Sequence, residues 1–348
     1  METIWFILMG LLLVLFVMLD GFDFGAGIIY PFVAKTNIER RTVLNAVGPV
    51  WDGNEVWLII GGGVLFFAFP AAYASSFSGY YLALILLLWL LMFRGLSMEL
   101  RSQLDSPLWH SFWDALLMLG SLLISLVLGV ALGNLLRGVP LQADGFFFLP
   151  LWTDFLTGVH PGILDWYTLL TGFFAIVLLA VHGANYIALK TEDAVQQRAR
   201  QLSQQWQWLV ALLTLALPFA TYVAQPMMIH NYQQYPAGLL LPVLAVMALI
   251  AGFLYRRRNN DCGAFASSAA LILILMLNMG FNIYPNLLIA TTDPANSLTI
   301  YSTATSEYAL RLGLVWFGIG ITLATGYTLF MYRSFRGKVR LSAEEEGY

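Results

Sequence analysis

The sequence predicts an all-α polytopic membrane protein with nine transmembrane helices. Hydrophobic residues make up 59% of the 348-residue chain and charged residues only 11%, and the mean hydropathy of +0.74 is well above that of soluble domains. Apolar runs of spanning length recur along the whole chain, and the basic residues fall almost entirely in alternate loops. The net charge of −3 gives no sign of a nucleic-acid partner. We therefore expect a single integral membrane domain over residues 1–348.

The nine expected spans follow from the apolar runs. They are at about 4–30, 54–71, 76–97, 113–136, 164–189, 206–225, 238–255, 263–284 and 309–332. The second and third need a separate argument, because residues 56–93 contain no charged side chain and could form one helix. Such a helix would be roughly 57 Å long, almost twice the ~30 Å hydrocarbon core. Pro70 and the small, polar run 75–79 therefore predict a short, tight connection where the chain turns back.

The orientation in the membrane follows from the basic residues in the loops between these spans. Only Arg137 and Arg311 fall on one side, and the other 15 of the 17 Lys and Arg residues fall opposite them. These are Lys35, Arg40, Arg41, Arg94, Arg101, Lys190, Arg198, Arg200, Arg256, Arg257, Arg258, Arg333, Arg336, Lys338 and Arg340. Basic loops face the cytoplasm, so we expect the N-terminus outside and the C-terminus in the cytoplasm.

Carboxylates lie within or beside the first two spans, near the cytoplasmic face. Asp20 and Asp23 belong to the motif DGFDFG in the first span, and Asp52 and Glu55 belong to WDGNEVW where the second begins. Each pair is three residues apart and therefore shares a helix face. Asp20 lies about 24 Å along the first helix from Ile4, which places it in the cytoplasmic half of the bilayer.

Arg94 and Glu99 lie where the third span returns to the same level, so six ionisable groups share one depth. Gly21, Gly25 and Gly27 would let a neighbouring helix approach the first span closely. Ionisable groups inside a membrane are costly and usually line an ion or proton path. We therefore expect a polar pocket that opens toward the cytoplasm and delivers protons, with Asp20, Asp23, Asp52, Glu55 and Arg94 as its candidate residues.

A structural role is the alternative for each of these groups. Asp52 or Asn54 could cap the second helix, and Asp20 could be a buried acid satisfied by Arg94 or by backbone donors. For Asp20 a proton-transfer role is favoured, because a purely structural contact could use Ser or Asn at a lower desolvation cost.

Two motifs also carry a resemblance to a known family. LDGFDFGAG, followed about thirty residues later by GPVWDGNEVWL, resembles subunit II of the cytochrome bd-type quinol oxidases of bacteria and archaea. The resemblance continues in the same order through the rest of the chain. It includes Phe93-Arg94 with Met98-Glu99-Leu100-Arg101, the run GNLLRGVP at 133–140, Tyr284-Pro285-Asn286, and Ser297-Leu298-Thr299-Ile300.

The resemblance implies two four-helix bundles plus one additional helix, in a heterodimer with subunit I. Such a complex oxidises a membrane quinol and reduces O2 to water with cytoplasmic protons, in the bacterial or archaeal cytoplasmic (inner) membrane. Subunit I is expected to ligate haem b and haem d. Asp20, Asp23 and Asp52 match acids of the family's proton-delivery region, and Trp57 matches an aromatic residue near an oxygen route. Some members hold a structural quinone, and small accessory subunits are further expected partners besides membrane lipid.

The positions of the histidines support the expectation that subunit I, and not this chain, ligates the haems. His110, His160 and His230 fall in expected loops, and only His182 lies in an expected span. Two axial ligands from facing helices usually hold a low-spin haem. His182 could ligate a five-coordinate haem, but a hydrogen-bonded role in helix packing is favoured. We therefore expect no haem ligand in this chain. His and Cys spacings typical of a metal site are absent from the sequence.

The first and fifth spans share a weak internal similarity. Residues 20–24 read DGFDF and residues 182–186 read HGANY, both near the cytoplasmic ends of helices that run from outside to inside. A parallel four-helix repeat would produce this match. Chance could also produce it, because only the glycine is identical.

Two other functions remain open on physical grounds. A proton-coupled secondary transporter could use Asp20 as its carrier acid, but it would need a central cavity and helices broken at the midplane. Alternatively, the chain could serve only as a scaffold for subunit I. Oxygen consumption after Asp20→Asn would separate these alternatives from a proton-delivery role.

Overall fold

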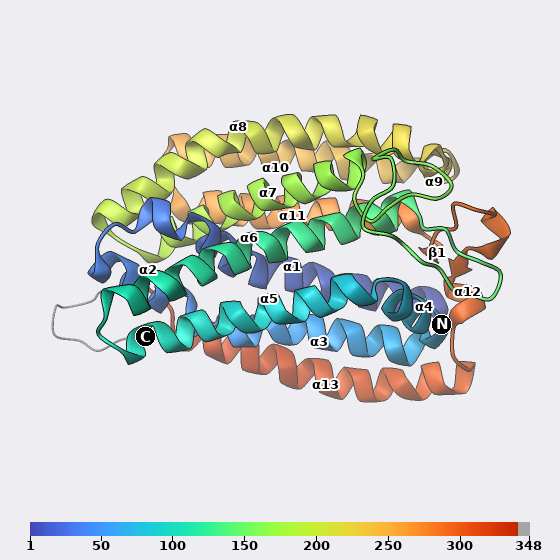
Figure 1. Cartoon of the computed structure of the whole chain (residues 1–348), viewed down its shortest axis with the longest axis horizontal. Helices are drawn as coiled ribbons and strands as arrows, with labels where there is room; N and C mark the ends of the chain where they lie inside the picture. The colour runs from blue at the N-terminus through green and yellow to red at the C-terminus, as the bar shows by residue number, and fades with distance from the viewer. Residues whose placement is uncertain (340–348) are drawn as a thin grey trace.

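The computed structural model describes residues 1–339, and the chain is built almost entirely of long helices that lie side by side (Figure 1). Within those residues eight helices are long and apolar enough to cross a membrane, and the number is nine if one bent pair of helices is counted as a single span. The helices at the nine expected positions are α1 (Glu2–Val33), α3 (Trp51–Ala68), α5 (Tyr81–Leu100), α6 (Pro107–Arg137), α7 (Trp166–Lys190), α8 (Asp193–Ala224), α10 (Leu240–Arg257), α11 (Asp261–Ile283) and α13 (Glu307–Ser334). The all-α polytopic fold class is thus confirmed.

Several helices begin earlier or later than the apolar runs. Helix α8 starts thirteen residues before the expected 206, because the polar segment from Asp193 continues the helix beyond the apolar part. Helix α7 starts at Trp166, where the Asp165 carboxylate accepts hydrogen bonds from the backbone N–H groups of Tyr167 and Thr168. Capping groups of this kind fix a helix start more sharply than hydropathy does.

The turn expected after Pro70 is a helix instead of a short connection. Helix α4 (Pro70–Gly79) follows α3 after a single residue, and the two axes differ by 120°. Proline at the first position of α4 suits a helix start, because its missing N–H has no partner there in any case. The expectation that residues 76–79 open the next span was therefore wrong, and α5 begins only at Tyr81.

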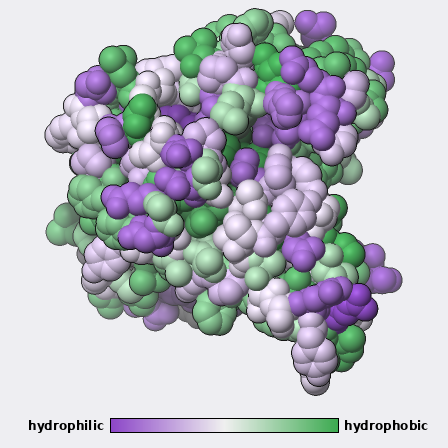
Figure 2. Space-filling view, turned by 90° about the vertical axis from the view of Figure 1, so that its right-hand side faces the viewer, coloured by the Kyte–Doolittle hydropathy of each residue, from purple (hydrophilic) through white to green (hydrophobic). Residues whose placement is uncertain are grey.

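Short elements fill the connections. They are α2 (Asn37–Val47), the 3₁₀ turns Arg101–Gln103, Pro226–Met228, Pro236–Leu239 and Pro294–Asn296, the helices α9 (Ile229–Gln234) and α12 (Ile300–Thr303), and the strands β1 (Asn286–Leu288) and β2 (Leu298–Thr299), which pair antiparallel. Helices α4, α9 and α12 gather at the same end as Met1, and α2 lies at the other (Figure 1). The end that carries α4, α9 and α12 shows hydrophilic residues among hydrophobic ones (Figure 2).

The long helices form two groups. Helices α1, α3, α5 and α6 make the first bundle, and α7, α8, α10 and α11 make the second. Helices α1 and α6 of the first bundle pack against α7 of the second. Gly25 makes the α1–α7 approach possible, since a Cβ there would lie 1.9 Å from the carbonyl oxygen of Leu179. Helix α13 lies outside both bundles beside α3 (Figure 1).

At the cytoplasmic end, as inferred from the basic loops, ion pairs join the connecting segments to the bundles. The Asp114 carboxylate accepts hydrogen bonds from the Tyr30 hydroxyl at 2.8 Å and from Arg40 and Arg101 at 2.6 Å each. Glu39 on α2 pairs with Arg198 on α8 at 2.5 Å, which joins a loop of the first bundle to the second.

Candidate functional site

Asp20 and Asp23 are buried in the middle of the first bundle. Both lie on α1, and their relative exposures are 0% and 3%. The fully buried guanidinium of Arg94 on α5 approaches both acids. Its Nη2 lies 2.8 Å from Asp20 Oδ1 and 3.9 Å from Asp23 Oδ2. Three of the candidate residues, expected from sequence to share one depth, thus meet in one place.

Glu55 on α3 completes the group. Arg94 Nη1 lies 2.8 Å from Glu55 Oε1, and the Glu55 side chain is 23% exposed. We call Asp20, Asp23, Glu55 and Arg94 the acid cluster. With all three carboxylates ionised, a single guanidinium would leave a net charge of −2 in an apolar setting. Uncompensated buried charge of this kind is costly.

Asn54 connects the acid cluster to α13. Its side-chain amide donates to Asp23 Oδ2 at 2.7 Å, and the Tyr332 hydroxyl donates to Asn54 Oδ1 at 2.8 Å. Sequence reasoning considered Asn54 only as a helix cap and missed Tyr332, which lies 278 residues away along the chain. The polar residues of WDGNEVW could have identified Asn54 as part of the site, whereas no sequence feature pointed to Tyr332.

Aromatic rings enclose the guanidinium of Arg94. Its carbon Cζ lies 4.6 Å from the centre of the Phe24 ring and 5.7 Å from that of Trp51. Such cation–π contacts stabilise a charge that has left water. Among residues 1–339, Asp20 Oδ2 and Asp23 Oδ1 have no hydrogen-bond partner. Both acids thus keep an oxygen free to bind or release a proton.

Asp52 and Glu99 lie outside the acid cluster. Both side chains are exposed, so only four of the six groups expected at this depth come together. The capping alternative for Asp52 and Asn54 was wrong, because the residue before α3 is Val50 and no side chain caps that helix start. Asp52 lies instead in the first turn of α3, one turn from Glu55.

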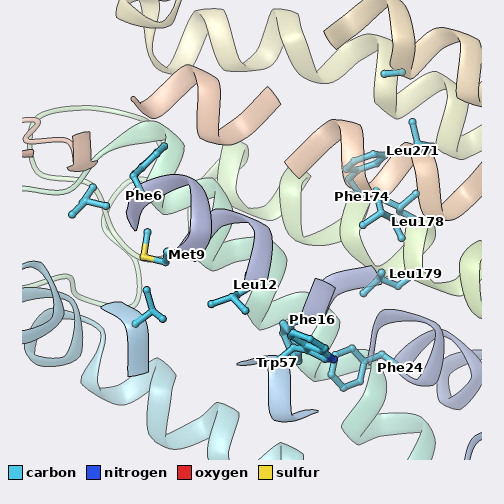
Figure 3. Packing of buried hydrophobic residues seen from close by; sticks show 14 of the residues in the cluster. Phe6, Met9, Leu12, Phe16, Phe24, Trp57, Phe174, Leu178, Leu179 and Leu271 are labelled. Carbon is cyan, nitrogen blue, oxygen red and sulfur yellow. The ribbon is translucent and has the colours of Figure 1, made fainter. Parts of the chain in front are cut away.

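Trp57 lies in the apolar core near the acid cluster. It is buried and packs in the same cluster as Phe16 and Phe24, which lie beside it in Figure 3. Phe24 in turn contacts Arg94. Trp57 is therefore at the boundary between the polar site and the hydrophobic interior.

His182 has both ring nitrogens engaged in hydrogen bonds. Nδ1 lies 2.8 Å from the Ser268 hydroxyl, and Nε2 lies 2.9 Å from the backbone oxygen of Met18. The ring also stacks on Phe265. This arrangement does not fit a haem ligand, which needs a free nitrogen directed at the iron. The other histidines lie in the first turn of α6 (His110), in a loop (His160) and in the short connecting helix α9 (His230), so the expectation that all three lie between the spans was wrong for His110.

An apolar cavity of about 400 Å³ lies between α1 and the second bundle. Phe16, Phe174 and Leu178 line its middle, and Tyr167, Tyr232 and Asn278 supply polar groups. The residues described hold no group of three or more His, Cys, Asp or Glu side chains arranged for a metal ion.

A family model described as cytochrome bd terminal oxidase subunit II matches residues 1–335. The chain belongs to this family. It is 34% identical to the probable cytochrome oxidase subunit 2 of Haemophilus influenzae, and 31% identical to cytochrome bd-I ubiquinol oxidase subunit 2 of Escherichia coli K12. Each match covers 97% of this chain and 95% of the relative. The fold is similar to that of bd oxidase from Geobacillus thermodenitrificans, with a TM-score of 0.74, 19% identity and coverage of 96% and 98% of the two chains.

As a cytochrome bd terminal oxidase subunit II, the chain is part of an oxidoreductase complex. The resemblance inferred from LDGFDFGAG and GPVWDGNEVWL is thus confirmed, and the family does not favour the secondary-transporter alternative.

Proposed function

We propose that this chain, as subunit II of a quinol oxidase, carries cytoplasmic protons toward the site where oxygen is reduced. The observation that supports this most directly is the acid cluster, in which three carboxylates share one guanidinium inside an apolar bundle. A structural ion pair would need one carboxylate. The excess of acids instead suits a group that repeatedly takes up and releases a proton.

The route begins at the cytoplasmic surface with Asp52 and the partly exposed Glu55. From Glu55 the proton passes to Asp23 and Asp20, both of which lie near the same guanidinium. Arg94 remains charged and holds the acids in place, because an arginine side chain does not release its proton in proteins. Asn54 keeps Asp23 oriented. Asp20 lies deepest along α1 and is the inner end of the route within this chain.

Asp20→Asn tests the proposal, because it keeps the shape of the side chain and removes the titratable group. Oxygen consumption per haem in the purified complex should fall by about tenfold or more, while haem content and assembly with subunit I stay normal. Asp114→Asn is the matched control, since Asp114 is also a buried acid paired with arginine but lies outside the cluster.

Loss of assembly in Asp20→Asn would instead support a purely structural contact. The proposal fails if Asp20→Asn and Asp23→Asn, separately and together, leave oxygen reduction and proton uptake unchanged. The proton route would then lie in the partner subunit. An unchanged rate with normal assembly would also favour a role for this chain as scaffold only.

Haem b and haem d are proposed to be bound by subunit I, with which this chain forms a heterodimer. The engaged nitrogens of His182 support this division. When bound there, the haems supply the iron that reduces oxygen. The chain expressed without subunit I should show no stoichiometric haem absorption. A one-to-one haem signal that His182→Ala abolishes would overturn this assignment.

The apolar cavity suits a structural quinone, an expectation that rests on the family. Its volume of about 400 Å³ and its apolar walls fit an isoprenoid chain, and Tyr167, Tyr232 and Asn278 offer hydrogen bonds to a quinone ring. Trp57 remains the candidate for an oxygen route, because it lies in the apolar interior in the same cluster as Phe24, whose ring contacts Arg94.

We place the chain in the bacterial inner membrane with its N-terminus outside and its C-terminus in the cytoplasm. The basic loops support this orientation, although Arg340 and Tyr348 lie outside the described residues. A reporter fused after Tyr348 should be active only in a cytoplasmic form, and one inserted near Asp144 only in an external form. Both reporters on the same side would mean that the number of spans is wrong by one.

A further inference from the structure

The second bundle contains its own polar residues, which the proposed route does not use. At the cytoplasmic end of α11, Asp261 pairs with Arg200 at 2.6 Å and with Arg256 at 2.8 Å. Arg256 is buried, and its Nη2 donates to Asn185 Oδ1 on α7 at 2.5 Å. The charged surface is thereby joined to an amide inside the bundle.

From Asn185 the hydrogen bonds continue inward to His182. Asn185 Nδ2 donates to the Ser268 hydroxyl at 3.2 Å, and that hydroxyl lies 2.8 Å from His182 Nδ1. Ser203 on α8 donates to Asn185 Oδ1 at 2.6 Å and so holds the amide from a third helix. We call Asp261, Arg256, Asn185, Ser268 and His182 the His182 column.

A small cavity of about 20 Å³ adjoins this column. Asn185, Gln207, Ser267 and Ser268 supply its polar groups, and each of these residues is more than nine-tenths buried. Gln207 approaches because residue 252 is glycine, where a Cβ would lie 2.5 Å from Gln207 Nε2. The Gln207 amide donates only a long hydrogen bond of 3.5 Å, to Leu249 O. A cavity of this size with two to four polar partners is what a buried water needs.

We propose that the small cavity binds a water molecule, and that this water and the two serine hydroxyls form a second path along which His182 exchanges protons with the cytoplasm. The Ser267 and Ser268 hydroxyls donate to the backbone oxygens of Gly263 and Phe265 at 2.7 and 2.9 Å. Rotation of a hydroxyl would let it donate to the water or to His182 instead, so that a proton can arrive on one side and leave on the other. Arg256 and Asn185 cannot pass protons in this way. They position the Ser268 hydroxyl and the water. Histidine is the side chain best suited to gain and lose a proton at the end of such a path.

The path does not depend on the role proposed for the acid cluster. It lies in the other bundle, and His182 contacts α1 through a hydrogen bond to the backbone oxygen of Met18 and through the ring of Phe22. The larger cavity is separate as well, although Leu178, labelled in Figure 3, lines both cavities.

Deuterium exchange at the ring carbon between the two histidine nitrogens tests the proposal in the intact complex. The complex is incubated in D2O, and mass spectrometry follows His182 with His110, His160 and His230 as internal references. A fully buried histidine without water access exchanges only when the structure opens. We expect His182 to exchange without such opening, at a rate within about tenfold of the reference histidines.

Gln207→Leu fills the small cavity with an apolar side chain and should slow exchange at His182 by about tenfold or more, with the references unchanged. Thr214→Val is the matched control, because Thr214 lies two turns further along α8, lines the larger cavity and should have no effect. If Gln207→Leu prevents assembly, Ser267→Ala replaces it and should also slow exchange.

Complete protection of His182 in the native complex, or an unchanged rate in the assembled variant, overturns the proposal. Asp20→Asn should leave this exchange unchanged, so the two proposals fail separately.

Discussion

The two bundles place different chemistry at matching positions. Helix α1 carries Asp20 and Asp23, and α7 carries His182 and Asn185 at the same spacing. An arginine in the C-terminal half of α5 or α10 completes each set. In the first bundle three carboxylates face Arg94, whereas in the second Arg256 pairs with Asp261 and an amide. In each bundle the residues of this weakly similar segment, DGFDF or HGANY, lie close to an arginine, and the excess of acid is found in the first bundle.

Removing the arginines should give the largest difference between the bundles. Arg94→Gln leaves three buried or partly buried carboxylates without a cation, and losses of about 3–5 kcal/mol are typical of broken buried pairs. Arg256→Gln leaves Asp261 with Arg200, so a loss of about 1–2 kcal/mol is expected. Thermal unfolding of the purified complex measures both. Adding Asp20→Asn to Arg94→Gln should restore part of the lost stability. Equal losses for Arg94→Gln and Arg256→Gln would contradict the inference that only the first bundle has more carboxylates than its arginine can balance.

A substitution at the contact between the bundles should lower the stability of the complex by nearly as much. Gly25→Ala brings a methyl group to 1.9 Å from Leu179 O and 2.7 Å from Gly183 N, both backbone atoms that cannot move aside. A loss of about 3 kcal/mol or failure to assemble is expected. Gly10→Ala on the same helix is the control, because nothing lies within 4 Å of its added methyl. Equal stability of the two variants would mean that the helices cross elsewhere.

At the entrance to the first bundle a smaller effect is expected. Asp52 is exposed, so water at the surface can bypass it when Asp52→Asn removes its charge. Oxygen consumption should change by no more than about twofold, against about tenfold for Asp20→Asn. A larger loss in Asp52→Asn than in Asp20→Asn would place the limiting step at the surface.

The weakest expected effect concerns the ion pair between Glu39 and Arg198. Hydrogen bonding to Arg198 lowers the pKa of Glu39 to about 2 from its usual 4.5. A lowered pKa means that the stabilisation is present above the usual value and is lost as pH falls toward 2. Because both side chains remain partly exposed at the surface, Glu39→Gln should cost less than about 1 kcal/mol near neutral pH. The difference in melting temperature from the native complex should shrink below about pH 4, and a difference independent of pH would exclude the ion pair as its cause.

The sequence predicted the acid cluster because charge inside an apolar run is rare enough to be noticed. Asp20, Asp23 and Arg94 were therefore found without any contact information. Asp52 was grouped with them by depth alone, but depth does not say which way a side chain points. The partner of Asn54 lies on the last helix, and no local pattern connects residues so far apart.

Hydropathy also identified the positions of the long helices better than their ends. Polar turns of α8 extend past the apolar part, and α4 forms where small residues suggested a turn. Helix formation depends on backbone hydrogen bonds and on capping groups such as Asp165. A hydropathy average contains no information about either.

Helix α13 has only Leu310 and Met331 buried, yet its Tyr332 holds the amide that orients Asp23. Most of its side chains face away from the bundles, and contacts such as that of Phe317 with Trp5 attach it to the first bundle. Sideways displacement of this helix would free Asn54 and change the surroundings of Asp23 without touching either acid. The hydrogen bonding of Asp23 therefore depends, through Asn54, on where the last helix lies.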